Sequence, residues 1–145
     1  MAARVSVTQR KGKIFVIPRS KTIAGFYIEQ EPIRTIVDED WEAVGKAILA
    51  ALQEYTEGAP VPDYKDKTSL AQKAAGCKSL AQYYRGLRSC SIAVEDKEMI
   101  VTPYETLGGR GGMIPISQAE FTAPTTTECQ TLGELAREGL LRAKG

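Results

Sequence analysis

Asp40 to Gly58, DWEAVGKAILAALQEYTEG, is the stretch that decides the fold class of this chain. Its large apolar residues recur at spacings of three and four, so they fall along one side of a helix with 3.6 residues per turn. They are Trp41, Val44, Ile48, Leu52 and Tyr55. The polar residues between them project to other sides. The stretch therefore predicts an amphipathic helix whose apolar stripe covers a hydrophobic core.

Both ends of this predicted helix carry local signals. Asp38, Glu39 and Asp40 stand at its start, where carboxylates accept hydrogen bonds from free backbone amides and suit the positive end of the helix dipole. Gly58 and Pro60 are expected to end it, since neither residue favours continuation of a helix.

A strand-rich block precedes the helix. Arg4 to Gln9 and Lys13 to Pro18 are rich in β-branched residues and are joined by three turn residues, which predicts a hairpin. Pro18 has no backbone N–H and is expected to end its strand or to lie at an edge. Gly25 to Gln30 is expected to return as a third strand. Ile33 to Val37 then continues as a strand extension or an extended approach to the helix.

In the second half of the chain, the spacing of the apolar residues changes twice, from helical to strand-like and back. Leu70 to Ala75 and Ser79 to Leu87 predict two short helices that are broken at a left-handed Gly76. A period of two then returns in a second hairpin, formed by 91–95 and 99–103, and in a strand at 113–117. No sequence repeat relates the two strand-rich blocks.

The last part of the chain is expected to hold one more helix. Ala119 to Glu128 predicts an irregular crossing, Thr131 is expected to cap the helix that follows, and residues 143–145 are expected to fray. Together the segments predict an α+β fold: antiparallel β-sheet meanders packed against a central long helix, two short helices and a C-terminal helix. A length of 145 residues fits a single domain spanning 1–145.

Composition narrows the class of protein. Nineteen Lys and Arg residues against eighteen Asp and Glu residues leave a net charge of +1, so no global charge attracts nucleic acid or a membrane. Cys77, Cys90 and Cys129 form no CxxC pair, which argues against a disulfide framework or a zinc ribbon. The N-terminal MAARVSVTQRKGK lacks an apolar signal core, and no apolar run reaches about 20 residues. We expect a cytoplasmic protein with no membrane partner.

Catalytic chemistry finds little support. The chain has no histidine, which removes Ser-His-Asp triads, Cys-His dyads and histidine-ligated metal sites. LGGRGG at 107–112 lacks the order of a phosphate-binding loop. Cys77 beside Lys78 is either a reactive thiol, as in a small enzyme, or a semi-buried cysteine. We expect no enzyme, no catalytic residue, no metal and no cofactor.

Two charged clusters are candidates for binding. The first is acidic, includes one aromatic residue suited to anchor an interface, and could steer a basic protein partner. We refer to it as the acidic set: Asp38, Glu39, Asp40, Glu42, Asp63, Tyr64 and Asp66. The alternative interpretation assigns its first four members to helix-dipole compensation and its aspartates at 63 and 66 to loop solvation.

The second cluster is basic and lies in the first hairpin. Its members are Arg4, Arg10, Lys11, Lys13, Arg19 and Lys21. They could meet a phosphate backbone, which makes a small nucleic-acid-binding module the second hypothesis for function. Protection of an edge strand by charge is the alternative interpretation.

Several phrases carry a family resemblance over nearly the whole chain. In order they are RVSVTQRKGKIFVIPRSKT, GFYIEQEP, the helix with GKAI, AAGCKSLAQYYRG and the closing TLGELARE. This order resembles the immunity proteins of bacterial contact-dependent growth inhibition (CDI) systems. The resemblance implies a small, cytoplasmic, non-enzymatic protein. Such a protein binds the C-terminal toxin domain of a cognate effector, often a nuclease, as a heterodimer and blocks its active site or substrate access. No position matches a fixed functional motif, so the resemblance implies no contact residues. If the toxin is a nuclease with a basic cleft, the acidic set is expected to occupy it, and no direct binding of nucleic acid is expected.

Overall fold

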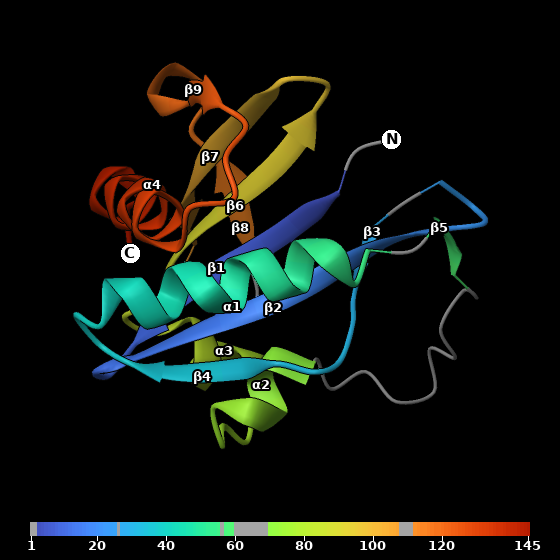
Figure 1. Cartoon of the computed structure of the whole chain (residues 1–145). Coiled ribbons are helices and arrows are strands. Elements are labelled where there is room, and N and C mark those ends of the chain that lie inside the picture. Colours follow the sequence, from blue (N-terminus) through green and yellow to red (C-terminus); the bar gives the residue numbers. More distant parts are fainter. Residues whose placement is uncertain (1–2, 26, 56, 60–69, 108–111) are drawn as a thin grey trace.

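The computed structural model describes residues 3–25, 27–55, 57–59, 70–107 and 112–145. Its centre is a sheet in the order β3-β2-β1-β6-β7-β8, with β4 and β5 also beside β2 and β9 beside β7 (Figure 1). The strands are β1 (Arg4–Arg10), β2 (Lys13–Thr22), β3 (Tyr27–Glu29), β4 (Arg34–Val37), β5 (Glu57–Ala59), β6 (Arg88–Glu95), β7 (Glu98–Thr106), β8 (Met113–Pro115) and β9 (Phe121–Pro124). The helices are α1 (Trp41–Gln53), α2 (Leu70–Ala74), α3 (Leu80–Tyr84) and α4 (Cys129–Arg142), with a 3₁₀ turn at Ser117–Ala119. The predicted α+β class is confirmed.

The predicted first hairpin is confirmed, and its turn explains its geometry. Lys11 and Gly12 both have positive φ, at 47° and 76°, as the tight turn of a twisted hairpin requires. The turn sets the register that places Val7 opposite Val16. Apolar side chains of both strands therefore meet on the same face of the sheet.

Pro18 does not end β2, which continues to Thr22. Pro18 lies opposite Val5 of β1, and its carbonyl accepts a hydrogen bond at 2.9 Å from the backbone N–H of Gln30 on the other side. The N–H that proline lacks would point to that same side. On that side of β2, the pairing with β4 ends at Val16 and the pairing with β3 begins only at Arg19. No strand of the described residues faces position 18 on that side, so proline costs the sheet no hydrogen bond.

The two strand-rich blocks form one sheet because β1 pairs with β6. Val7 lies opposite Cys90 in this antiparallel pair, and β6 continues into the predicted second hairpin with β7. The pairing is antiparallel throughout the described strands, with the exception of β5, which runs parallel to β2. Local sequence signals placed each block correctly but could not show that they join edge to edge.

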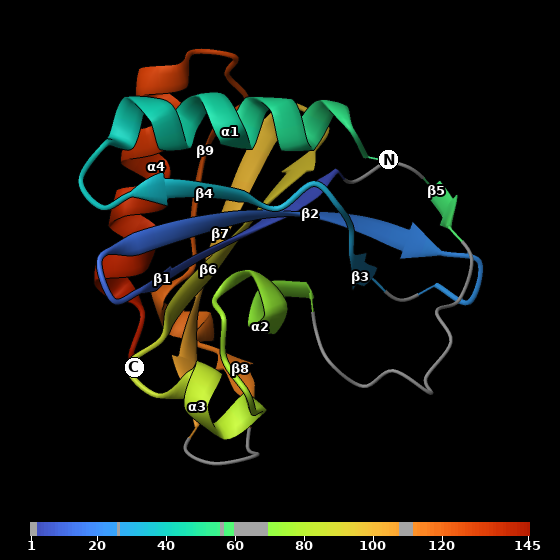
Figure 2. The ribbon, with the colours of Figure 1, turned by 90° about the horizontal axis from the view of Figure 1, so that it is seen from below.

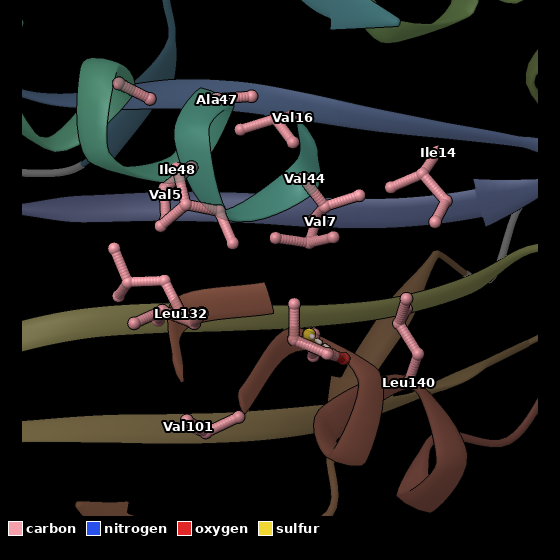
Figure 3. Close-up of a cluster of buried hydrophobic side chains, with 14 of the residues drawn as sticks. Val5, Val7, Ile14, Val16, Val44, Ala47, Ile48, Val101, Leu132 and Leu140 are labelled. Atoms are coloured by element: carbon pink, nitrogen blue, oxygen red, sulfur yellow. Dashed lines mark hydrogen bonds between the residues drawn. The ribbon is translucent and has the colours of Figure 1, made fainter. Parts of the chain in front are cut away.

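The larger core lies between one face of the sheet and helices α1 and α4 (Figure 3). Val5 and Val7 of β1 meet Val44 and Ile48 of α1, and each of these four side chains has no exposed surface. From α4, Leu132 and Leu140 complete the cluster. Truncating one of these large buried side chains to alanine costs about 2–5 kcal/mol.

A second, smaller core lies on the opposite face of the sheet, beneath α2 and α3 (Figure 2). Phe15 and Ile17 of β2 alternate with the residues that face α1 and pack against Tyr83 and Leu87. Ser79 accepts a hydrogen bond from Gln82 N at 3.1 Å and starts α3, as predicted. The break at Gly76 is also confirmed, with a φ of 71°.

The long helix begins as predicted but ends earlier than Gly58. The side chain of Asp40 accepts a hydrogen bond from Ala43 N at 3.3 Å, and the stripe of Val44 and Ile48 is buried. The last helical residue is Gln53. Beyond it the Glu54 carboxylate pairs with Arg34, and the backbone of Glu57–Ala59 pairs with the edge of β2. The helix therefore ends before Gly58 and Pro60, because the residues after Gln53 make contacts with β4 and β2 that a longer helix would not allow.

The region from 119 to 128 is not an irregular crossing throughout. Phe121–Pro124 forms β9, which pairs with β7 and places Phe121 opposite Val101. This pairing is favourable because it partly buries the Phe121 ring, which packs against the larger core. The Arg142 guanidinium lies over the same ring, 4.3 Å from its centroid.

Two predictions at the end of the chain were also wrong. Helix α4 starts at Cys129, and Thr131 is already helical: its hydroxyl donates to the Glu128 carboxylate at 3.2 Å instead of capping the helix. Residues 143–145 do not fray, because Ala143 is buried and Lys144 bridges to Glu105 of β7.

Candidate binding surface

The acidic residues at the start of α1 lie in the turn that follows β4. The Asp38 carboxylate accepts hydrogen bonds from Gln9 Nε2 at 2.7 Å and from the backbone N–H of Glu39 at 3.0 Å. Glu39 itself has a left-handed φ of 71° and is exposed. The hydrogen bond to Gln9 ties this turn to β1, so the sheet holds the Asp38 carboxylate in place.

Asp38 and Glu39 line a cleft of about 500 Å³, which we name the Asp38 cleft. Its walls come from β1, the turn before α1, the first residue of α1, β6 and α4. The lining residues are Gln9, Asp38, Glu39, Trp41, Arg88, Arg137, Leu140 and Leu141. Segments from both halves of the chain meet here because β1 pairs with β6 and α1 packs on α4.

The Asp38 cleft carries charges of both signs. Within the part of the chain that the structure describes, no ion pair joins Asp38 or Glu39 to Arg88 or Arg137. None of the four charges is therefore neutralised by an ion pair with a described residue. Large apolar side chains stand exposed at or beside the cleft, with Leu141 at 61% and Val37 at 75% exposure. Exposed apolar surface among charged groups is typical of protein-binding sites.

The structure does not bring the whole acidic set together. Asp40 caps α1, and Glu42 is the second residue of the helix, where its Oε1 lies 3.9 Å from Lys46 Nζ in an exposed ion pair. Neither lines the Asp38 cleft. Asp63, Tyr64 and Asp66 lie outside the described residues.

Arg88 and Arg137 were missed by reasoning from the sequence. Each is a single exposed cation without a local signal, one at the start of β6 and the other in α4. Only the pairing of β1 with β6 and the packing of α4 bring them to Asp38. The cleft is thus more balanced in charge than the acidic set alone predicted.

Each arginine of the basic hairpin makes a contact with another part of the fold, and only Arg10 is buried. Arg10 is 7% exposed and donates to the carbonyls of Tyr83 and Gln82, at 3.2 and 3.0 Å. Arg19 donates to Ser6 Oγ at 2.8 Å, and the Arg4 guanidinium lies over the Tyr27 ring. The lysines of this cluster, Lys11, Lys13 and Lys21, are exposed. Of the six residues that could meet a phosphate backbone, Arg10 is therefore buried, Arg4 and Arg19 are half-buried, and only the three lysines are exposed.

Comparison with known proteins supports the fold resemblance. No protein-family model matches the sequence, and no curated protein matches it. A protein of unknown function from Neisseria meningitidis has a similar structure, with a TM-score of 0.78 and 14% identity over 99% of this chain and 96% of that one. A chain of the CdiA-CT/CdiI toxin and immunity complex from Yersinia pseudotuberculosis has a TM-score of 0.75 and 15% identity, over 99% and 98%. This chain has a CDI immunity-protein fold.

Within the immunity-protein fold the cysteines serve packing. Cys77 is 9% exposed in the smaller core, as the semi-buried interpretation predicted, and Cys90 is fully buried against α4. Burial raises the pKa of Cys90 to about 12, which keeps it a neutral thiol. Cys129 is half-buried, and all three are free thiols.

Two further features are absent from the described part of the chain. No group of three or more carboxylate or thiol side chains is arranged there to hold a metal ion. None of its helices combines the length and apolar character that a membrane span needs.

Proposed function

We propose that this protein is a CDI immunity protein that binds and neutralises the cognate C-terminal toxin domain of a CDI effector. The observation that carries the proposal is the fold shared with a chain of a toxin and immunity complex, over 99% of this chain and 98% of that one. Because function resides in sites rather than in folds, the Asp38 cleft provides the second line of support.

The Asp38 cleft has the composition of a protein-binding surface. Trp41 and Leu141 offer apolar contact, and the unpaired charges of Asp38 and Glu39 are available to basic groups of a partner. If the toxin is a nuclease, its substrate cleft carries cations that meet phosphate groups. The acidic set would then occupy that cleft, with Asp40, Glu42, Asp63 and Asp66 adding to the field and Tyr64 anchoring the contact. Complementary charge would speed association and fix the orientation of the complex.

Inhibition of this kind is stoichiometric and requires no catalytic group. A protein that covers the active site or the substrate path of the toxin neutralises one toxin molecule for each copy bound. The proposed place of action is the cytoplasm, the compartment in which a nuclease toxin meets its substrate.

Calorimetric titration tests this function directly. The protein is titrated with the purified toxin domain encoded by the adjacent upstream gene, in a catalytically inactive form. One-to-one binding with a Kd at or below about 10⁻⁸ M is expected, equivalent to roughly −11 kcal/mol. A toxin domain from an unrelated CDI effector is the matched control and should give no binding heat. Absence of heat with the cognate domain at two temperatures, with both proteins folded, would overturn the proposal.

A further inference from the structure

A second cleft, of about 320 Å³, lies on the sheet face opposite α1. This is the face on which α2 and α3 pack (Figure 2). We name it the Arg4 cleft. On β1 and β6 its residues alternate with those of the larger core, so they point away from α1. The residues that carry the argument are Arg4, Arg19, Tyr27, Tyr84, Ser91 and Tyr104.

Two guanidinium groups in this cleft are positioned but only partly bonded. The Arg4 guanidinium carbon lies over the Tyr27 ring, 4.3 Å from its centroid, in a cation–π contact that favours this position. Its Nε is buried and has no hydrogen-bond partner among the described residues. Arg19 uses its Nε to donate to Ser6 Oγ at 2.8 Å, and no other bond of its guanidinium to a described residue is found.

The Arg4 cleft holds two cations, and the carboxylate of Glu29 acts on it from outside the lining, since burial and then the Glu29 charge raise the pKa of Tyr84. No Asp or Glu is among its lining residues, and no carboxylate of the described residues forms an ion pair with Arg4 or Arg19. Glu29 lies opposite Arg19 in the β2–β3 register, but its carboxylate accepts from the backbone N–H of Ala71 at 3.3 Å. An anionic group entering the cleft would therefore meet two cations without having to displace a carboxylate.

Hydroxyl groups complete the lining. Ser91 Oγ and Tyr104 OH lie 3.3 Å apart. The Tyr84 hydroxyl can also donate, and burial together with the charge of Glu29 raises its pKa above the ordinary 10.0, against the lowering effect of Arg19. Hydroxyl donors beside forked guanidinium donors are the groups that bind carboxylate oxygens best.

We propose that the Arg4 cleft binds an acidic segment of a protein partner, with a carboxylate side chain held between Arg4 and Arg19. The volume exceeds that of a single carboxylate group and admits a side chain with flanking backbone. Tyrosine and arginine are also the residues enriched where proteins bind one another. The inference rests on the proposed function for the partner's identity, since the acidic segment would belong to the toxin.

The first experiment tests the cleft without the toxin. A blocked tetraglutamate peptide is titrated into the ¹⁵N-labelled protein, and a tetraglutamine peptide serves as the probe without charge. Saturable amide shifts around the Arg4 cleft are expected with tetraglutamate and not with tetraglutamine. These shifts should be lost in the double variant Arg4→Gln and Arg19→Gln. Arg142→Gln is the matched control, because the Arg142 guanidinium also lies 4.3 Å from an aromatic centroid, that of Phe121.

The second experiment measures the affinity of the same variants for the inactive toxin domain. At least a tenfold loss is expected for the Gln variants and less than twofold for Arg142→Gln. Arg19→Lys keeps the charge but loses the forked donors, so an intermediate loss is expected. If the Gln variants fail to fold, this lysine variant decides the comparison.

The outcomes separate the cleft from the proposed function. Tight toxin binding that is unchanged in folded Arg4 and Arg19 variants would overturn the role of the cleft and leave the immunity function standing. Absence of toxin binding by the wild-type protein would overturn the immunity function, and the peptide titration would then decide the cleft alone. No saturable tetraglutamate binding, or equal binding by the Gln variants, would overturn the cleft as a carboxylate site.

Discussion

Gly45 of α1 lies directly against the backbone carbonyl of Cys129 at the start of α4. A Cβ atom placed on Gly45 would stand 1.6 Å from that carbonyl oxygen. The contact is reciprocal, since a Cβ on Gly133 of α4 would stand 1.9 Å from the carbonyl oxygen of Trp41. The two helices that cover the larger core therefore touch backbone to backbone, at positions where no other residue fits.

Gly45→Ala is expected to destabilise the protein by at least about 2 kcal/mol, because the added methyl forces the two helices apart. Alanine is the better helix former by about 1 kcal/mol, so the clash must outweigh a favourable change in propensity. Lys46→Ala, at the next and exposed position, is the control and should stay within about 0.5 kcal/mol of wild type. Urea unfolding measures both, and a Gly45→Ala variant as stable as wild type would contradict the close contact.

Arg10→Met is expected to cost about 3 kcal/mol of stability. The substitution keeps an apolar stem but leaves the carbonyls of Gln82 and Tyr83 without their charged donor. Lys11→Met, at an exposed turn position, should change stability by less than about 0.5 kcal/mol. The two variants remove the same charge, so equal thermal melts would show that the contacts of Arg10 to α3 do not stabilise the fold.

Stability is expected to fall steeply at alkaline pH. Burial raises the pKa of Tyr83 from its ordinary 10.0 to about 12, and the pKa of Cys90 from 9.0 to about 12. The folded state holds these protons more tightly than the unfolded state does. The contribution of these two groups to the free energy of unfolding is thus complete below about pH 9. It is lost as the pH rises through about 12.

Tyr83→Phe provides the comparison for this pH dependence. It should lose less stability than wild type between pH 7 and pH 12, by up to about 3 kcal/mol, because it has no phenol to deprotonate. Urea unfolding at a series of pH values gives the two slopes. Parallel curves for wild type and Tyr83→Phe would show that this buried phenol is not the source of the alkaline loss.

Asp38→Asn with Glu39→Gln is expected to weaken toxin binding by about tenfold and to reduce its dependence on salt. The amide of an asparagine at 38 can still accept from Gln9 and from the next backbone N–H, so the turn should keep its shape. Glu95→Gln with Glu98→Gln removes two exposed charges from the β6–β7 hairpin and is the control. If toxin affinity falls equally in both double variants, or stays unchanged in both, the Asp38 cleft is not part of the interface.

Asp40 allows capping and binding to be separated. Asp40→Asn keeps an oxygen that accepts from Ala43 N, whereas Asp40→Ala loses it and should cost about 1 kcal/mol. Toxin affinity should fall in both variants if the charge of Asp40 contributes to the interface. Affinity equal to wild type in Asp40→Asn would leave capping as the role of this residue.

Local signals predicted much of this fold because the features they specify are local. The spacing of Val44 and Ile48, the cap at Asp40 and the break at Gly76 depend on a few neighbouring residues, and each is confirmed. Strand β9 was missed because a β7 edge satisfies its backbone and the larger core receives Phe121. Nothing within TAPTTTE shows that such an edge is available.

The candidate sites depend even more on distant contacts. The Asp38 cleft needs Arg88 and Arg137, which only the β1–β6 pairing and the packing of α4 bring to Asp38. One signal for that packing was present in the sequence. Gly45 stands inside a predicted helix, where glycine is costly, and such a glycine often marks a close backbone approach.

The pairing of β1 with β6 also orders events during synthesis. The ribosome releases β1 early, yet the strand that pairs with its second edge begins only at Arg88. Helix α4, which completes the cover over Val5 and Val7, leaves after all the strands of the sheet. Closure of such distant contacts is slow, and partly finished chains expose apolar surface while they wait. In a nascent chain of this protein, the larger core therefore stays partly uncovered until α4 has emerged.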